Sequence, residues 1–299
     1  MKHIIEAQQF TAEYLDTLFK SATHLETNPS KALEGKILAS LFYEPSTRTR
    51  LSFESAMIRL GGNVITTENA GEFSSAIKGE TLEDSIKVIS SYADVIALRH
   101  PEEGAANMAA SVSSVPVINA GDGAGQHPTQ ALLDLYTIQR EVGKIDGVKI
   151  ALLGDLRNGR TVRSLCYLLG KYKDIHIDLV SPKDLKIGDD IKLYLKKREV
   201  SFTEHESFEH IVSSVDVVYQ TRIQKERFKS QAEYEKNKGV YVLNLANTAS
   251  MKPEAVIMHP LPRVDELDQE LDGLPKAAYF RQAKYGLYIR MALLLDVCS

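Results

Sequence analysis

The sequence predicts an α/β protein of two domains, each built on a parallel β-sheet flanked by helices. Apolar runs of strand length alternate with helical patterns from Ile37 onward. This alternation restarts after a polar stretch with two glycines at residues 141–147. With 299 residues and 43% apolar content, the chain is long enough to build a core for each of two domains.

In the first half, the first strand is predicted at Ile37–Tyr43, closed by Glu44-Pro45 and followed by a helix with Phe53, Met57 and Leu60 on one face. The pattern continues with strands at 64–65, 95–98 and 115–119, a helix carrying Leu82, Ile86 and Ile89, and a helix from about Thr129. Strands separated by helices favour parallel pairing, because a parallel neighbour needs a long crossover connection.

In the second half, strands are predicted at 148–153, 177–180, 215–219, 240–245 and 256–258. A strongly apolar helix at 287–295 closes the chain, and we expect it to return to the first domain. The predicted division is therefore residues 1–143 plus 285–299 for one domain and 144–284 for the other, with a hinge near 140–147.

Composition excludes several classes of protein. Lys and Arg total 36 against 40 Asp and Glu, and the net charge of −4 argues against a nucleic-acid-binding surface. The cysteines, Cys166 and Cys298, have neither metal-ligand nor disulfide spacing, which fits a reducing cytoplasm, and Cys166 is expected in the core. Without a signal-like start at Met1–Phe10 or a membrane-length apolar run, the chain is predicted to be soluble and cytoplasmic.

Two motif-like segments do not carry the chemistry that they suggest. Gly121, Gly123 and Gly125 follow a strand, but Gln126 stands where a dinucleotide fingerprint needs its last glycine. His205 and His210 are five residues apart, about 140° around a helix, which does not suit a metal pair. A Walker loop is also absent from the sequence. We therefore expect neither a cofactor nor a metal.

The segment Ser46-Thr47-Arg48-Thr49-Arg50 lies at the start of the first predicted helix. The first amides of a helix lack intrahelical partners, and the helix dipole adds partial positive charge there, so this position favours an anion. Hydroxyl groups and a guanidinium from Arg48 or Arg50 would add donors suited to phosphoryl oxygens. The alternative is that Ser46 or Thr47 only caps the helix and the arginines are solvated.

Every other strong motif also follows a predicted strand. In open α/β sheets, ligands collect beyond the carboxyl ends of the strands. The segments at these ends all carry an Arg or a His: Arg99-His100-Pro101, His127-Pro128-Thr129-Gln130, Gly154 to Arg160, Arg222-Ile223-Gln224 and His259-Pro260-Leu261-Pro262-Arg263.

With these motifs in this order, the chain closely resembles the aspartate/ornithine carbamoyltransferase family along essentially its whole length. His259-Pro260-Leu261-Pro262 and the segment from Arg222 to Arg227 resemble the aspartate-specific members. Two cationic side chains in the second domain also suit aspartate, which has two carboxylates, better than ornithine, whose amine needs an acidic partner.

The resemblance implies transfer of a carbamoyl group from carbamoyl phosphate to the amine of L-aspartate, a step in pyrimidine biosynthesis. It implies that Ser46, Thr47, Arg48, Thr49 and Arg99 hold the phosphate, and that Thr49, Arg99 and His127 donate to the carbonyl oxygen on which charge develops. It further implies that Gln130 and the carbonyls of Pro260 and Leu261 orient the carbamoyl nitrogen. Aspartate is then held by Arg160, by Arg222 with Gln224, and by Lys78.

The same resemblance implies a homotrimer in which Ser74 and Lys78 reach the active site of the neighbouring subunit, although a solvated loop is the simpler interpretation of that segment. A regulatory chain or another enzyme of the pyrimidine pathway is a possible partner. Two other functions remain open: a carbamoyltransferase for another amine such as ornithine, and a catalytically silent scaffold that binds phosphate ligands.

Overall fold

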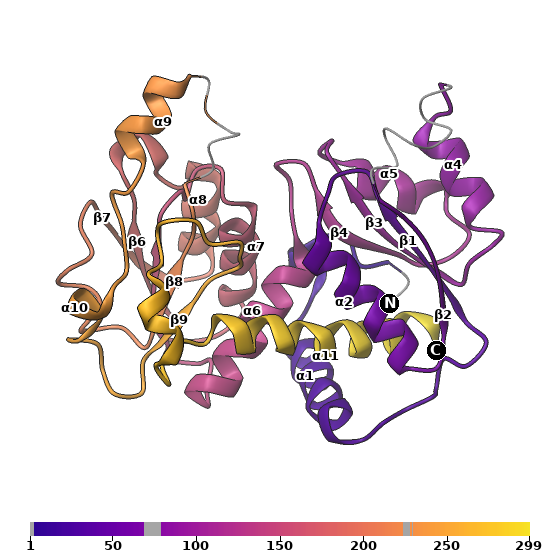
Figure 1. The fold of residues 1–299 in the computed structure, drawn as a ribbon, viewed down its shortest axis with the longest axis horizontal. Coiled ribbons are helices and arrows are strands. Elements are labelled where there is room, and N and C mark those ends of the chain that lie inside the picture. The colour runs from indigo at the N-terminus through magenta and orange to yellow at the C-terminus, as the bar shows by residue number, and fades with distance from the viewer. Residues whose placement is uncertain (1–2, 69–78, 224–227, 229) are drawn as a thin grey trace. The chain divides into compact units, whose positions relative to one another are not determined.

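A computed structural model describes residues 3–68, 79–223, 228 and 230–299. The chain forms two compact units (Figure 1). Unit 1 consists of Met1–Leu132 with Lys284–Ser299, and unit 2 of Leu133–Ala283. Two helices, α6 (Pro128–Val142) and α11 (Tyr279–Cys298), contribute residues to both units. Both changes of unit thus fall inside helices, whereas the first predicted boundary, 143/144, lies just beyond the end of α6 and the second, 284/285, lies within α11.

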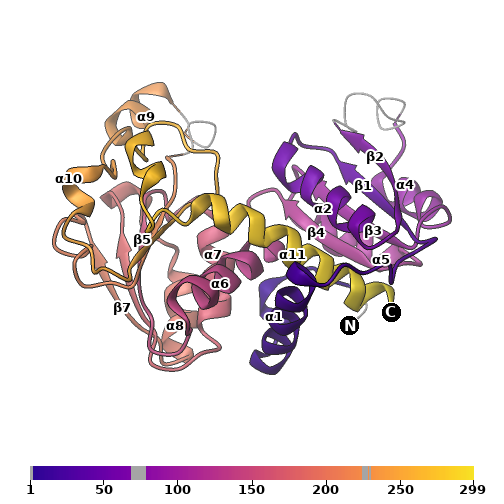
Figure 2. The same cartoon turned by 60° about the horizontal axis from the view of Figure 1, so that its bottom comes forward.

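Unit 1 is built on a four-stranded parallel sheet in the order β2-β1-β3-β4. Its strands are β1 (Ile37–Phe42), β2 (Asn63–Glu68), β3 (Val95–His100) and β4 (Val117–Asp122). Its helices are η1 (Ala7–Gln9), α1 (Ala12–Thr27), α2 (Thr47–Arg59), α4 (Leu82–Ile89) and α5 (Ala105–Val112), with the last part of α11. Helix α2 packs against β1 and β2, and α5 against β3 and β4 (Figure 2).

Unit 2 is built on a five-stranded parallel sheet in the order β7-β6-β5-β8-β9. Its strands are β5 (Lys149–Leu153), β6 (His176–Val180), β7 (Ser201–His205), β8 (Val217–Gln220) and β9 (Val256–Met258). Its helices are α7 (Arg160–Leu169), η3 (Lys183–Leu185), α8 (Asp189–Lys197), α9 (Gln231–Asn237), α10 (Leu245–Thr248) and η5 (Gln269–Gly273). The predicted fold class, two parallel sheets flanked by helices, is confirmed.

Burial explains which strands the sequence reveals. The central strands β1, β3, β5 and β8 are buried over nearly their whole length, so they read as continuous apolar runs. Cys166 is fully buried in α7, as expected. By contrast, β7 lies at the edge of its sheet and its residues are mostly exposed, so its polar sequence gave no strand signal.

The strand predicted at 240–245 is wrong. In this segment Leu243 forms only an isolated bridge with Leu267, and helix α10 begins at Leu245. The reason is a capping box: the Asn244 side chain accepts the Asn247 amide, and the Asn247 side chain accepts the Asn244 amide. These two bonds favour a helix start over continuation of a strand.

Each sheet contains one point at which the strand order changes direction. In unit 1 the chain moves from β1 outward to β2 and then returns to the other side of β1 with β3. In unit 2 it moves from β5 to β6 and β7 and returns beside β5 with β8. Crevices for ligands form at such points, beyond the carboxyl ends of the two diverging strands.

Candidate active site

The segment after β1 begins helix α2 as predicted. Ser46 is the N-cap residue, and its side chain makes no capping hydrogen bond. Thr47 and Arg48 are exposed in the first turn, whereas Thr49 is buried. Because Ser46 does not cap the helix through its hydroxyl, the amides of the first turn remain directed toward an external acceptor.

The two arginines of this segment differ. The Arg50 guanidinium lies 3.0 Å from a Glu68 carboxylate oxygen and 3.5 Å from one of Glu54. It also donates to the Thr66 hydroxyl at 3.4 Å. Arg50 therefore ties α2 to β2, and Arg48 is the better candidate for the anion.

Arg99 lies at the end of β3 and is 9% exposed. One terminal nitrogen, Nη2, is 3.4 Å from Glu44 Oε1, and the other, Nη1, is 3.5 Å from the Ala120 carbonyl oxygen. The guanidinium thus lies between the segment that follows β1 and the end of β4. This position places a buried cation at the point where the unit 1 sheet changes direction.

The glycines after β4 form a turn that positions His127. The Asp122 carboxylate accepts the amides of Gly104 and Gln126, both at 3.1 Å. Gly123 has φ 46°, and a Cβ there would lie 2.6 Å from the Pro101 carbonyl oxygen. The turn therefore needs glycine for its own geometry and its contact with the β3 loop. It sets His127 directly before the start of α6.

His127 is 4% exposed and Gln130 is 9% exposed. The His127 ring nitrogen Nδ1 lies 3.5 Å from the Thr129 hydroxyl. Together with Thr49 and Arg99, these residues give unit 1 a set of buried polar side chains that follow β1, β3 and β4. Buried donors of this kind act in a medium of low dielectric, where they stabilise charge strongly.

A pocket of about 580 Å³ lies nearby in unit 1, with Tyr43 and His100 on its wall. Four carboxylates also line it: Glu80, Glu83, Glu102 and Glu103. Negative charge of this density disfavours a phosphate. None of the predicted ligand-binding residues is among its lining residues, so the pocket is not the predicted site.

In unit 2 the carboxyl ends of β5 and β8 are in direct contact. The Thr221 amide and hydroxyl both donate to the Leu153 carbonyl, at 2.8 and 2.9 Å. Gly154 has φ 116°, and a Cβ there would lie 2.3 Å from the Thr221 carbonyl oxygen. Arg160, the first residue of α7, and Arg222, directly after Thr221, therefore come from the two strands at which the sheet changes direction. Both are half-buried.

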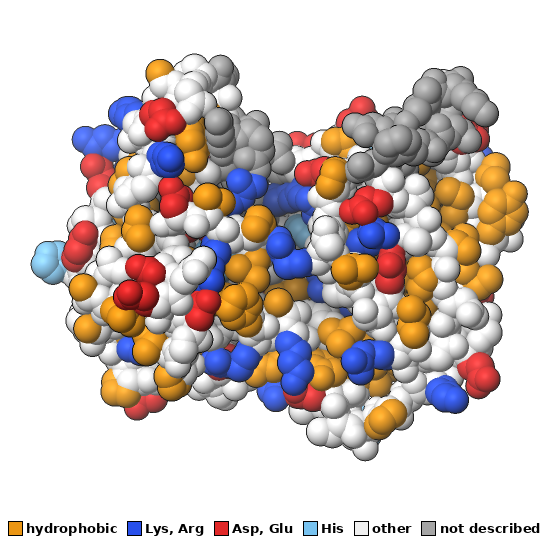
Figure 3. Space-filling model, viewed as in Figure 1, with side chains coloured by type: hydrophobic (Ala, Val, Ile, Leu, Met, Phe, Trp, Pro, Cys, Tyr) orange, Lys and Arg blue, Asp and Glu red, His pale blue; other side chains and the backbone are white. Residues whose placement is uncertain are grey.

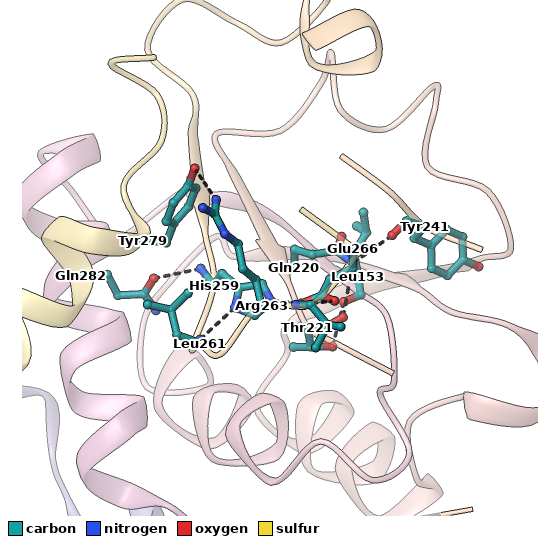
Figure 4. A network of polar contacts seen from close by, with 11 residues as sticks. Leu153, Gln220, Thr221, Tyr241, His259, Leu261, Arg263, Glu266, Tyr279 and Gln282 are labelled. Atoms are coloured by element: carbon teal, nitrogen blue, oxygen red, sulfur yellow. Dashed lines mark hydrogen bonds and ion pairs between the residues drawn. The ribbon is translucent and has the colours of Figure 1, made fainter. Parts of the chain in front are cut away.

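The turn after β9 is held by a buried histidine (Figure 4). His259 is 1% exposed, and its Nε2 lies 2.7 Å from Glu266 Oε1. The Leu261 amide donates to His259 Nδ1 at 2.8 Å, and the His259 amide donates to Gln282 Oε1 at 2.9 Å. Pro260 and Leu261, predicted to present their carbonyls to the substrate, thus lie in a fixed turn.

The side chain of Arg263, which ends the same motif, is held by contacts within unit 2 and has a structural role. Its Nη2 is 2.7 Å from Asp272 Oδ2, and its guanidinium lies 5.5 Å from the centre of the Tyr279 ring. The hydrogen bond to Asp272 raises the pKa of the guanidinium, and the pKa of Asp272 is lowered chiefly by its bond to Arg263. This pair anchors the turn to the start of α11.

Sequence reasoning did not single out Glu266, Gln282 or Asp134. The Gln282 side chain donates to Asp134 Oδ1 at 2.6 Å, and the Tyr219 hydroxyl donates to Asp134 Oδ2 at 2.7 Å. The available signal was a polar residue on an otherwise apolar helix face, at Asp134 in α6 and Gln282 in α11. Such a residue needs a buried partner, which the sequence does not identify.

Three predicted residues, Ser74, Lys78 and Gln224, lie outside the described residues.

Within the described part of the chain, no group of three or more His, Cys, Asp or Glu side chains could hold a metal ion. The helices of that same part include none with the length and hydrophobicity to cross a membrane. Both basic and acidic side chains are visible on the face drawn in Figure 3.

Two family descriptions match the sequence. "Aspartate/ornithine carbamoyltransferase, carbamoyl-P binding domain" matches residues 2–140, and "Aspartate/ornithine carbamoyltransferase, Asp/Orn binding domain" matches residues 146–297. Aspartate carbamoyltransferase 3, chloroplastic, of Pisum sativum is 59% identical over 97% of this chain and 76% of its own length. The aspartate carbamoyltransferase catalytic subunit of Methanocaldococcus jannaschii is 53% identical over 98% of this chain and 97% of its own length.

Solved structures give the same result. The catalytic subunit of M. jannaschii aspartate transcarbamoylase is similar with a TM-score of 0.92 and 52% identity, covering 99% of this chain and 98% of that one. The Trypanosoma cruzi aspartate transcarbamoylase in complex with N-(phosphonacetyl)-L-aspartic acid has a TM-score of 0.93 and 41% identity, covering 99% of this chain and 95% of that one.

Proposed function

Since the chain belongs to the aspartate/ornithine carbamoyltransferase family, we propose that it is a carbamoyltransferase with L-aspartate as the acceptor. It transfers the carbamoyl group of carbamoyl phosphate to the amine of L-aspartate, giving N-carbamoyl-L-aspartate and phosphate in pyrimidine biosynthesis. The observation that carries the acceptor assignment is the pair Arg160 and Arg222, which follow the two adjoining strands at which the unit 2 sheet changes direction. Two guanidinium groups at such a point suit the two carboxylates of aspartate.

Unit 1 supplies the groups for carbamoyl phosphate. The first turn of α2, with Ser46, Thr47, Arg48 and Thr49, binds the phosphate, and Arg99 neutralises its charge as it leaves. The amine attacks the carbamoyl carbon, a C–N bond forms, the C–O bond to phosphate breaks, and the proton that the amine loses passes to the departing phosphate. Negative charge develops on the carbonyl oxygen, where donors from Thr49, Arg99 and His127 each contribute about 3 to 4 kcal/mol.

Gln130 and the carbonyls of Pro260 and Leu261 orient the carbamoyl nitrogen in this proposal, and Gln224 and Lys78 assist Arg222 with aspartate. His127 acts as a hydrogen-bond donor and not as the base. Holding two substrates in line supplies much of the remaining acceleration, up to roughly 7 to 11 kcal/mol in favourable cases.

A carbamoyl-transfer assay with alternative acceptors tests the assignment. We expect turnover with L-aspartate and none with L-ornithine. Turnover with ornithine alone would move the protein to another acceptor class, and absence of turnover with either would favour the silent scaffold. A bisubstrate phosphonate joined to aspartate should bind far more tightly than phosphate or aspartate, because it carries both sets of contacts at once.

The assembly is a finer proposal: a homotrimer in which Ser74 and Lys78 act in the neighbouring subunit's site. Its support is the resemblance of that segment, and the M. jannaschii relative is named a catalytic subunit. Mixing inactive Lys78→Ala chains with inactive His127→Ala chains under exchange conditions should restore activity. Failure to restore activity in verified mixed trimers would contradict shared sites.

Pull-down from the native host tests for a regulatory chain or pathway partner, and fractionation tests the cytoplasmic location.

A further inference from the structure

The turn that follows β9 in unit 2 depends on which nitrogen of His259 carries the proton. The imidazole is buried, with Nε2 at 2.7 Å from Glu266 Oε1 and Nδ1 at 2.8 Å from the Leu261 amide nitrogen. A backbone N–H can only donate, so Nδ1 must accept with a lone pair. The proton therefore belongs on Nε2, where it is donated to the carboxylate.

Glu266 is suited to hold this tautomer. The residue is 5% exposed, and the Val264 amide also lies 3.3 Å from each carboxylate oxygen. Burial acts to raise the pKa of Glu266, but the hydrogen bond from His259 and the backbone amides hold it below the ordinary value. The Glu266 carboxylate is thus an ionised acceptor at neutral pH. If the His259 proton were on Nδ1 instead, the carboxylate would face the lone pair of Nε2.

Peptide geometry links this histidine to the substrate-facing carbonyls. The Leu261 N–H and the Pro260 C=O belong to one planar trans peptide, so they point in opposite directions. Fixing the N–H against Nδ1 therefore fixes the direction of the Pro260 carbonyl. Leu261 itself has φ 50°, in the left-handed region that leucine rarely adopts, so the turn needs a bond that holds it there.

A second set of bonds holds the start of the turn. The His259 amide donates to Gln282 in α11, Gln282 donates to Asp134 in α6, and Tyr219 in β8 donates to Asp134. All of these side chains are buried within unit 2. The histidine backbone is therefore fixed, and the ring only has to set the orientation of the following peptide.

We propose that His259 and Glu266 are positioning residues for carbamoyl transfer: the carboxylate keeps the proton on Nε2, and Nδ1 then orients the Pro260–Leu261 peptide toward the substrate. This inference rests on the proposed function. Neither side chain contacts the reacting atoms. Both act through the Pro260 carbonyl, which shares a peptide plane with the Leu261 N–H.

Two variants of His259 separate this role from simple stability. In His259→Asn the amide oxygen can replace Nδ1 as acceptor for Leu261, but the side chain is too short to reach Glu266. In His259→Gln the amide reaches the Nε2 position and can donate to Glu266, but the acceptor for Leu261 is lost. A purely structural role predicts that activity follows thermal stability in both variants.

We expect kcat within about fivefold of wild type for His259→Asn and at least about 30-fold lower for His259→Gln, because a displaced orienting group costs up to two orders of magnitude in rate. The melting temperature of the Gln variant should equal or exceed that of the Asn variant. Binding of inorganic phosphate, which relies on unit 1, should be unchanged in both. Equal losses of kcat, or losses ordered as the melting temperatures, would overturn the proposal.

Glu266 gives an independent comparison. Glu266→Gln keeps an oxygen acceptor for Nε2–H and should stay within about threefold in kcat, whereas Glu266→Leu should lose at least about tenfold. The matched control is His205→Gln, because His205 Nε2 lies 2.8 Å from Asp178 Oδ1 in the same unit but away from the turn. An equal loss in the control would overturn the proposal. Wild-type protein without any turnover would instead reject the proposed function itself.

Discussion

The two units hold the amino ends of their sheets in the same way. In unit 1, Asp94 precedes β3 and accepts the Ile37 amide and the Lys36 ammonium, both at 2.9 Å. In unit 2, Asp216 precedes β8 and accepts the Lys149 amide at 2.9 Å and the Lys252 ammonium at 2.7 Å. Each aspartate thus caps the first amide of the neighbouring strand and adds an ion pair.

The carboxyl ends differ. Unit 1 presents three buried side chains there, Thr49, Arg99 and His127, each at most 9% exposed, beside the exposed Thr47 and Arg48. Unit 2 presents the half-buried arginines Arg160 and Arg222. Buried donors suit charge that develops during the reaction, because they need no reorganisation. Half-exposed guanidinium groups suit a dicarboxylate that must exchange water for ion pairs as it binds. In each unit the amino end of the sheet therefore has a structural role, and the carboxyl end is suited to its ligand.

The largest expected loss of activity is at the carboxyl end of the unit 1 sheet, where the side chains are buried. Arg99→Ala should lower kcat/KM for carbamoyl phosphate about 10³-fold, because it removes a desolvated cation from the leaving phosphate and the carbonyl oxygen. Steady-state kinetics measures this, with Arg59→Ala as the control, an exposed arginine on α2. A kcat/KM of Arg99→Ala within tenfold of wild type would contradict the contrast between the carboxyl ends of the two sheets.

A smaller loss of activity is expected at the carboxyl end of the unit 2 sheet, where the arginines are half-buried. Arg222→Ala should lower kcat/KM for aspartate about 10²-fold, since a half-exposed ion pair is partly replaced by water. Binding of phosphate, followed by calorimetry, should not change. The control is Arg157→Ala, an exposed arginine in the loop after β5. Unchanged aspartate turnover in Arg222→Ala would contradict the acceptor assignment.

The network beneath the unit 2 site should matter for stability. Tyr219→Phe removes a 2.7 Å hydrogen bond to buried Asp134, and burial together with Asp134 raises the pKa of Tyr219 well above its ordinary value. The free energy of unfolding of unit 2 should fall by about 2 kcal/mol. Urea unfolding measures this, with the more exposed Tyr194→Phe as a comparison. A change below about 0.5 kcal/mol would mean that Asp134 finds another donor.

The smallest effects are expected at the amino ends. Burial acts to raise the pKa values of Asp94 and Asp216, but the lysine and amide partners hold both below the ordinary value of 3.8. Each carboxylate therefore adds stability that is fully present above about pH 3.8 and is lost as the pH falls through the lower folded pKa.

Asp94→Asn and Asp216→Asn should each cost about 0.5 to 1 kcal/mol at pH 7. The difference from wild type should shrink toward zero as the pH falls below 3.8, which thermal unfolding across a pH series measures. Unequal costs would show that the two aspartates are not equivalent, and a cost independent of pH would show that their ionisation is not the source of the stability.

Local sequence revealed most of the fold, because buried parallel strands are continuous apolar runs and their helices follow at regular spacing. It failed at β7, whose edge position leaves its residues polar, and at 240–245, where the Asn244 capping box begins a helix instead. In both places the deciding feature is a neighbour or a local bond that hydrophobic pattern does not encode.

The sequence by itself determined which residues follow strands and what chemistry they can perform, since these depend on order and residue type. Only the tertiary structure decided which strands are neighbours, and hence that the strands before Arg160 and Arg222 adjoin, while Arg50 is engaged by Glu68 of strand β2. It also brought Glu266 to His259 and Asp134 to Gln282. The second of these contacts joins residues that are 148 positions apart in the chain, and only the packing of whole helices brings them together.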